Sequence, residues 1–261
     1  MFQGNHSSVK NHELIDYPVA MISTNFTEKL PTTYTLIIIN IVVWIILQIL
    51  GGSTDTKTLV ELGALTSLHL KLEGEYWRLL TSMFLHIGIL HLLVNCLSLF
   101  IIGSMTERIF GSFSMLLIYV MSGFSGGSVS YAMLGPYSVA AGASGAVFGC
   151  LGAVGSYFLL RKKIMGEVGR QSFNAVLMLA GINFVFGIIV PSVDNWAHIG
   201  GFIGGTLIGY GLVPKLTNTY LNYHLNPLER WLTPFQRIIV GLIAWGTISL
   251  VAIKIGNSGI I

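Results

Sequence analysis

The chain has 261 residues, of which 53% are hydrophobic and only 10% carry a charge. An average soluble domain carries about 25% charged residues, so this composition excludes an ordinary soluble protein and indicates one that crosses a membrane several times. The formal net charge of +3 is small and its basic residues are dispersed, so the sequence does not suggest a nucleic-acid partner.

Seven apolar stretches approach the length of about 20 residues that a helix needs to span a bilayer. They run approximately over 34–50, 86–106, 112–134, 139–160, 172–190, 196–213 and 236–254. The sequence therefore predicts an all-α polytopic membrane bundle. We expect a short cytoplasmic tail over 1–33, a core over 34–213, and a linker with a seventh membrane helix over 214–261.

The basic residues indicate the orientation of this bundle. With a cytoplasmic N-terminus, ten of the 14 lysines and arginines fall in cytoplasmic segments, including Arg161, Lys162 and Lys163 in a basic loop over 161–171. The long loop 51–85 then lies outside, and its leucines, interspersed with charges, predict an amphipathic segment in the outer interface. The predicted location is the cell membrane, with a multi-pass topology.

Cys96 and Cys150 both lie in apolar runs, far from any CxxC or Cys/His spacing. Such cysteines are typical of small buried side chains rather than of a disulfide or a zinc site. His86 and His91 are five residues apart and fall on different helix faces, which makes them a poor metal pair. We expect no metal and no cofactor.

Two polar residues of the apolar stretches suggest a catalytic pair. Ser144 lies between Gly142 and Gly145, whose missing side chains would let a substrate backbone reach the hydroxyl. On the expected orientation, Ser144 and His198 lie at similar depth below the outer ends of the fourth and sixth spans. A histidine is the usual base for a serine nucleophile, so the pair indicates acyl transfer. Each residue alone has a more ordinary explanation, in helix packing or in a bond to a backbone carbonyl.

Small residues would allow these two spans to approach closely. They recur at helical spacing on the face of each catalytic candidate, at Gly201, Gly205 and Gly209 after His198 and at Gly145, Gly149, Gly152 and Ser156 beside Ser144. Bare helix faces of this kind permit the short distance that a serine–histidine hydrogen bond requires.

His91 and Asn95 provide candidate donors for an oxyanion. They are four residues apart and therefore share one face of the second span. Together with the backbone N–H of Ser144, they could stabilise the negative charge that develops during acyl transfer. The alternative for both residues is ordinary hydrogen bonding between helices.

Five motifs follow one another along residues 76–209. They are Trp77-Arg78; Phe84-Leu85-His86 with His91 and Asn95; Glu107-Arg108 with Gly111; Gly142-Ala143-Ser144-Gly145; and Ala197-His198 with the glycines 200, 201, 204 and 205. In this order they resemble the motifs of the rhomboid family of intramembrane serine proteases.

The resemblance implies a rhomboid-like six-helix core, here with an additional seventh helix. It implies cleavage of peptide bonds in or next to transmembrane segments of substrate proteins within the lipid bilayer. Ser144 would be the nucleophile and His198 the general base, while His91 and Asn95 would join the Ser144 amide in the oxyanion site. Phe148 would pack against the catalytic imidazole, and His86 would be structural. The oligomeric state stays open.

Other functional classes fit the residues less well. A membrane metalloprotease would need an HExxH run, and an aspartyl protease would need two buried acids, which the spans lack. Asp194 precedes His198 by four residues, as a triad acid might, but its position at the lipid–water boundary favours a loop cap or a surface role. The remaining alternative is a non-proteolytic transporter or a quality-control protein that binds membrane helices.

Overall fold

The computed structural model describes residues 29–133, 135–214 and 232–259, which form a helical bundle with one short pair of strands. The helices of the bundle are α2 (Pro31–Leu50), α5 (Gly88–Ser98), α6 (Ser104–Phe110), α7 (Ser112–Met133), α8 (Ser144–Ile189), α9 (Asn195–Leu212) and α12 (Pro234–Ser258). Short elements are α3 (Thr56–Glu61), β1 (Leu65–Thr66), η1 (His69–Glu73), α4 (Arg78–Thr81), η2 (Ser82–Phe84), η3 (Leu99–Gly103) and β2 (Val139–Ala140). The predicted tail, up to residue 28, and most of the predicted linker lie outside the described residues.

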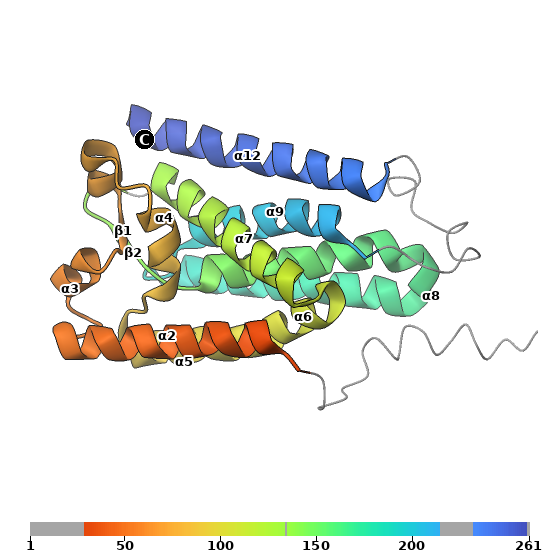
Figure 1. Ribbon diagram of the computed structural model, residues 1–261, viewed down its shortest axis with the longest axis horizontal. Helices are drawn as coiled ribbons and strands as arrows, with labels where there is room; N and C mark the ends of the chain where they lie inside the picture. Colours follow the sequence, from red (N-terminus) through yellow and green to blue (C-terminus); the bar gives the residue numbers. More distant parts are fainter. Residues whose placement is uncertain (1–28, 134, 215–231, 260–261) are drawn as a thin grey trace, which may run out of the picture.

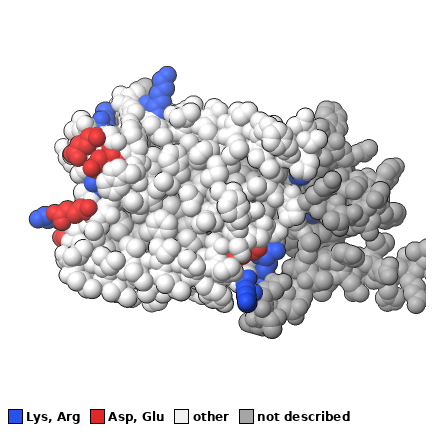
Figure 2. All heavy atoms as spheres, in the orientation of Figure 1, with Lys and Arg blue, Asp and Glu red and all other residues white. Residues whose placement is uncertain are grey.

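The prediction of an all-α polytopic fold is confirmed. Within the described ranges, five helical stretches are long and apolar enough to cross a membrane: Pro31–Leu50, Gly88–Phe110, Ser112–Met133, Ser144–Ile189 and Pro234–Ser258. The fourth stretch contains two predicted spans, 139–160 and 172–190. They are separated at Gly166, where φ is 56° and the chain leaves the helical conformation. Figure 2 shows the charged side chains toward the two ends of the molecule, with an uncharged surface between them. This surface is the one that would face lipid.

Two predicted boundaries are wrong. The fourth span begins at Ser144 rather than at 139, because Val139–Ala140 pairs antiparallel with Leu65–Thr66 and the Gly142 N–H donates to the Ser82 carbonyl over 2.9 Å. The predicted basic loop 161–171 is helical on both sides of Gly166, so the two arms of α8 are joined by a kink at one residue.

The loop 51–85 is folded rather than one amphipathic segment. Arg78 is buried in it and donates from Nε to Glu75 Oε2 over 2.6 Å. Its Nη1 donates to the carbonyls of Val60 and Ala64 over 2.5 and 3.1 Å. A buried guanidinium with this many acceptors holds the short elements together. In Figure 1, α3, α4, β1 and β2 lie together at one end of the bundle, which the last turns of α2 also reach.

Helix α9 packs against α7, α8 and α12. Its contact with α8 depends on glycine on both sides: a Cβ on Gly201 would lie 1.9 Å from the Gly145 carbonyl oxygen, and a Cβ on Gly205 would lie 2.0 Å from that of Gly149. The predicted close approach of these two faces is confirmed. Because their backbones touch, side chains at the start of the two helices can meet.

Candidate active site

Ser144 and His198 form a hydrogen-bonded pair. Ser144 is the first residue of α8, and His198 lies in the first turn of α9, with only 6% of its surface exposed. The distance from His198 Nε2 to Ser144 Oγ is 2.9 Å. The sequence expected Ser144 about a turn inside its helix, whereas the structure places it at the helix start.

The position at the start of α8 has a chemical consequence that the sequence reading missed. The first backbone N–H groups of a helix have no partner within the helix, and this end of the helix dipole is positive. The nucleophile hydroxyl therefore sits at the helix end whose backbone N–H groups favour negative charge. Gly142 is the residue of the sequence that could have indicated this helix start. Its φ of 137° is outside the helical region, so the helix can begin only after it.

Phe148 lies one turn after Ser144 and stacks on the histidine ring. The two ring centroids are 4.1 Å apart and the planes differ by 9°. The Nδ1 atom of His198 is buried and has no hydrogen-bond partner among the described residues. The imidazole is therefore held by the serine and by the phenylalanine, and no carboxylate bonds to it within the described part of the chain.

A cavity of about 40 Å³ opens beside Ser144. Gly142, Gly145, Ser130 and Asp194 are among the residues that line it. A buried water needs roughly 10–15 Å³ and two or more polar partners, so the cavity has room for a few water molecules. Hydrolysis at Ser144 requires such access for water.

His91 lies against the strand that leads to Ser144. The Ile87 N–H points at His91 Nδ1 over 3.4 Å, which leaves the proton of a neutral ring on Nε2. A Cβ on Gly142 would lie 2.8 Å from that Nε2, so only glycine leaves room for the ring. His91 can thus offer an N–H close to the turn that precedes the serine.

Asn95 is buried, and one N–H of its side-chain amide is engaged within α5. Its Nδ2 donates to the His91 carbonyl over 3.0 Å, within the same helix. The structure therefore brings together Ser144, His198 and Phe148, and places His91 against Gly142. The Asn95 amide keeps a second N–H that this bond does not use.

His86 supports the residue before the serine. Its Nε2 accepts from the Ala143 N–H over 3.4 Å, and its Nδ1 lies 3.3 Å from the Phe84 carbonyl. Burial, with a smaller effect of nearby His91, lowers the pKa of His86 to about 4. The ring is therefore neutral, with one nitrogen donating and the other accepting, as both contacts require.

Asp194 has a partner that the sequence did not suggest. The predicted capping role is present, since its Oδ1 accepts from the Ala197 N–H over 2.9 Å. Its Oδ2 also accepts from the hydroxyl of Ser130 on α7. Nothing in the sequence linked Ser130 to the site, because the two residues meet only through the packing of α7 and α9.

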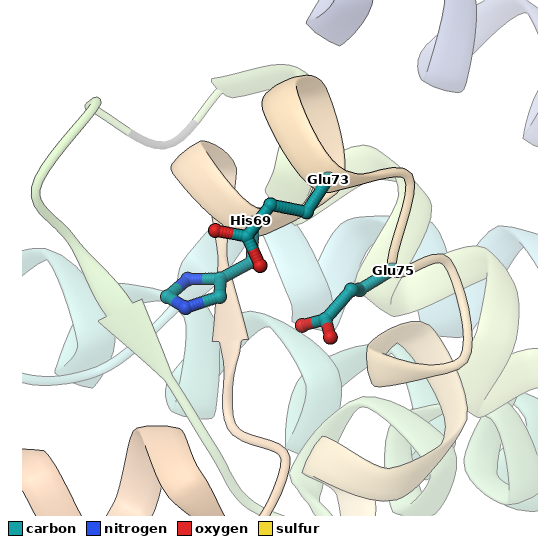
Figure 3. A group of neighbouring side chains, drawn as sticks. All are labelled: His69, Glu73 and Glu75. Carbon is teal, nitrogen blue, oxygen red and sulfur yellow. The ribbon is translucent and has the colours of Figure 1, made fainter.

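Outside this site, Figure 3 shows His69, Glu73 and Glu75 grouped in the loop 51–85. Their potential ligand atoms lie within 4.8 Å of one another, a spacing that a metal ion could use. Glu75 pairs with Arg78, however, and His69 Nδ1 lies 2.6 Å from Thr66 Oγ1. We therefore describe the group as part of the polar network of the loop.

Comparison with known proteins agrees with the motif order. Residues 73–215 match the family model of the Rhomboid domain. The chain is 45% identical over 194 residues to Rhomboid protease GluP of Bacillus subtilis, covering 73% of this chain and 37% of that protein. It is 39% identical over 179 residues to RHOMBOID-like protein 1 of Arabidopsis thaliana, covering 69% and 45%. Putative rhomboid protease YdcA of Bacillus subtilis is 29% identical over 199 residues, covering 75% and 95%. The chain thus spans less than half the length of the first two relatives.

Proposed function

Because the chain belongs to the rhomboid family, we propose that it is an intramembrane serine endopeptidase that hydrolyses peptide bonds in or next to transmembrane segments of membrane proteins. The observation that carries the proposal is the distance of 2.9 Å between His198 Nε2 and Ser144 Oγ. A serine hydroxyl becomes a useful nucleophile when a base at this distance takes its proton.

The proposed reaction uses these residues in turn. Ser144 Oγ attacks the scissile carbonyl while His198 Nε2 takes the hydroxyl proton. The oxyanion is stabilised by the Ser144 amide, at the start of α8, by the His91 Nε2–H and by the second N–H of the Asn95 side-chain amide. His198 returns its proton to the leaving amine, and an acyl-enzyme forms on Ser144. A water molecule from the adjoining cavity, deprotonated by His198, releases the acyl group and restores the serine.

Labelling and cleavage by the full chain test this proposal. We expect a fluorophosphonate to label the wild type at Ser144 and not Ser144→Ala. Purified wild type should also cut a single-span substrate, with the cut site mapped by mass spectrometry. A transporter or a helix-binding quality-control protein would bind the substrate without cutting it and would resist the probe. That pattern would reject the protease.

Replacing the Asn95 side chain tests the proposed oxyanion site. We expect Asn95→Ala to lower kcat by up to about 10²–10³, the effect of losing one oxyanion donor, with a smaller change in KM. The loss should be milder than that of Ser144→Ala, because other donors remain. A variant changed only in KM would instead place Asn95 in substrate binding.

We also propose that the active site opens to the extracytoplasmic side of the cell membrane and that the N-terminus is cytoplasmic. The balance of basic residues supports this orientation. The residues 34–213 would form the protease core, with transmembrane segments of other proteins as substrates.

Cysteine labelling of intact cells tests the orientation. In a background without Cys96 and Cys150, a cysteine at Lys57, whose ammonium is exposed, should react with a membrane-impermeant thiol reagent. A cysteine at Lys163 should react only after the membrane is permeabilised. The reverse pattern would turn the cavity toward the cytoplasm and overturn the orientation.

A further inference from the structure

The proposed catalytic pair lacks a third group that orients the histidine ring. In a Ser–His–Asp triad, an acid bonded to Nδ1 holds the imidazole in place. Here Nδ1 of His198 has no hydrogen-bond partner among the described residues. The position of the ring therefore depends on the stacked Phe148 and on where the first turn of α9 lies.

Asp194 controls that turn through three hydrogen bonds. Its Oδ1 accepts from the Ala197 N–H over 2.9 Å, and its backbone carbonyl accepts from the His198 N–H over 3.2 Å. Its Oδ2 accepts from the Ser130 hydroxyl. One residue thus links the backbone of the proposed base to the neighbouring helix α7.

Helix α7 also supports the nucleophile. A Cβ on Gly126 would lie 2.8 Å from the Ala197 carbonyl oxygen and 3.5 Å from Gly145 Cα. The helix therefore contacts both the turn that carries His198 and the start of α8. A bond that fixes α9 on α7 consequently fixes the histidine relative to the serine.

We propose that Asp194 is a positioning residue of the proposed protease, acting on His198 through helix α9 rather than through the imidazole. This inference rests on the proposed function. The role is geometric, so asparagine should replace aspartate: it is an equally good N-cap, and its amide group can bond the Ser130 hydroxyl as a donor. Alanine removes both side-chain bonds. A displacement of about 1 Å between reacting groups can cost about 10²-fold in rate.

The experiment compares four variants of the full chain: Asp194→Ala, Asp194→Asn, Ser130→Ala and the control Ser128→Ala. Ser128 lies on the same helix as Ser130, and its hydroxyl bonds only the Phe124 carbonyl of that helix among the bonds described, over 2.8 Å. The readouts are the fluorophosphonate labelling rate, kcat and KM with a single-span substrate, the Tm, and hydrogen exchange of the amides at the start of α9.

We expect Asp194→Ala to lower the labelling rate and kcat by about 10²-fold with little change in KM, and to speed exchange at the start of α9. Asp194→Asn should keep the labelling rate, kcat and hydrogen exchange at wild-type values. Ser130→Ala should give values between those of the wild type and Asp194→Ala, and Ser128→Ala should match the wild type. Ser130→Ala keeps the Asp194 N-cap, so it reports on the hydrogen bond between α7 and α9 even where Asp194→Ala folds poorly.

Two results would overturn the inference. One is wild-type labelling and kcat in folded Asp194→Ala and Ser130→Ala; the other is an equal loss in Asp194→Asn and Asp194→Ala, which would assign the effect to charge. Failure of the proposed function looks different: the wild type itself would neither react with the probe nor cut the substrate, whatever the exchange data show.

Discussion

Replacing Ser144 or His198 by alanine should each reduce cleavage to background, a loss on the order of 10⁶-fold in kcat, and the double variant should lose little more. The reason is that the two side chains work as one unit. Ser144 Oγ is the nucleophile and His198 Nε2, 2.9 Å away, is its base, so the attack fails once either is gone. The measurement is the turnover of a single-span substrate by the two single variants and the double variant.

The control for the dyad experiment is the fold of each variant. Ser144→Ala removes only a hydroxyl, so we expect its Tm to be nearly unchanged. His198→Ala removes a buried ring stacked on Phe148, so we expect a lower Tm in a protein that still folds and binds substrate. Independent, additive effects of the two substitutions, or appreciable turnover by either single variant, would contradict a shared catalytic step.

Gly201→Ala should damage both stability and activity although it removes no polar group. Its Cβ would lie 1.9 Å from the Gly145 carbonyl oxygen and 2.7 Å from the Gly145 carbonyl carbon, one residue from the proposed nucleophile. Backbone cannot yield as a flexible side chain can, so α8 and α9 must separate. We expect a loss of stability of about 1–3 kcal/mol and a fall in kcat of about 10²-fold.

Gly246→Ala is the matched control for this packing experiment. Gly246 lies in α12, and a Cβ there would meet nothing within 4 Å. Because alanine favours a helix over glycine by up to about 1 kcal/mol, this variant should be as stable as the wild type or more so, and equally active. Equal Tm and kcat for Gly201→Ala and Gly246→Ala would refute the steric argument.

Much of the architecture was predictable because the bilayer imposes a simple rule on the sequence. A helix surrounded by lipid must be apolar over about 20 residues, so the spans are visible as apolar runs. The recurring glycines of the fourth and sixth spans revealed the faces that touch, since close backbone contact allows no larger residue at Gly201 and Gly205. The candidate pair Ser144 and His198 followed from the same reading.

The boundaries were less predictable because they depend on partners far away in the chain. Residues 139–143 are as apolar as a span, but Val139 and Ala140 pair with β1 and the Gly142 N–H bonds the Ser82 carbonyl, which moves the helix start to Ser144. The leucines mixed with charges in the loop 51–85 predict an interfacial segment, but they do not reveal its internal structure. Burial of Arg78 among backbone carbonyls makes the loop a folded unit.

The amino-acid sequence alone was enough to identify a helical membrane protein, the residues that carry its reactive groups, and the helix faces that are bare enough to touch. The packing of the helices had to be known to see that Ser144 begins its helix, that the Asn95 amide bonds within α5, and that Asp194 connects α9 to α7. The physical reason is the range of the interactions. Transfer of a segment into lipid depends on its own residues, whereas a hydrogen bond depends on which distant groups the packed helices bring within about 3 Å.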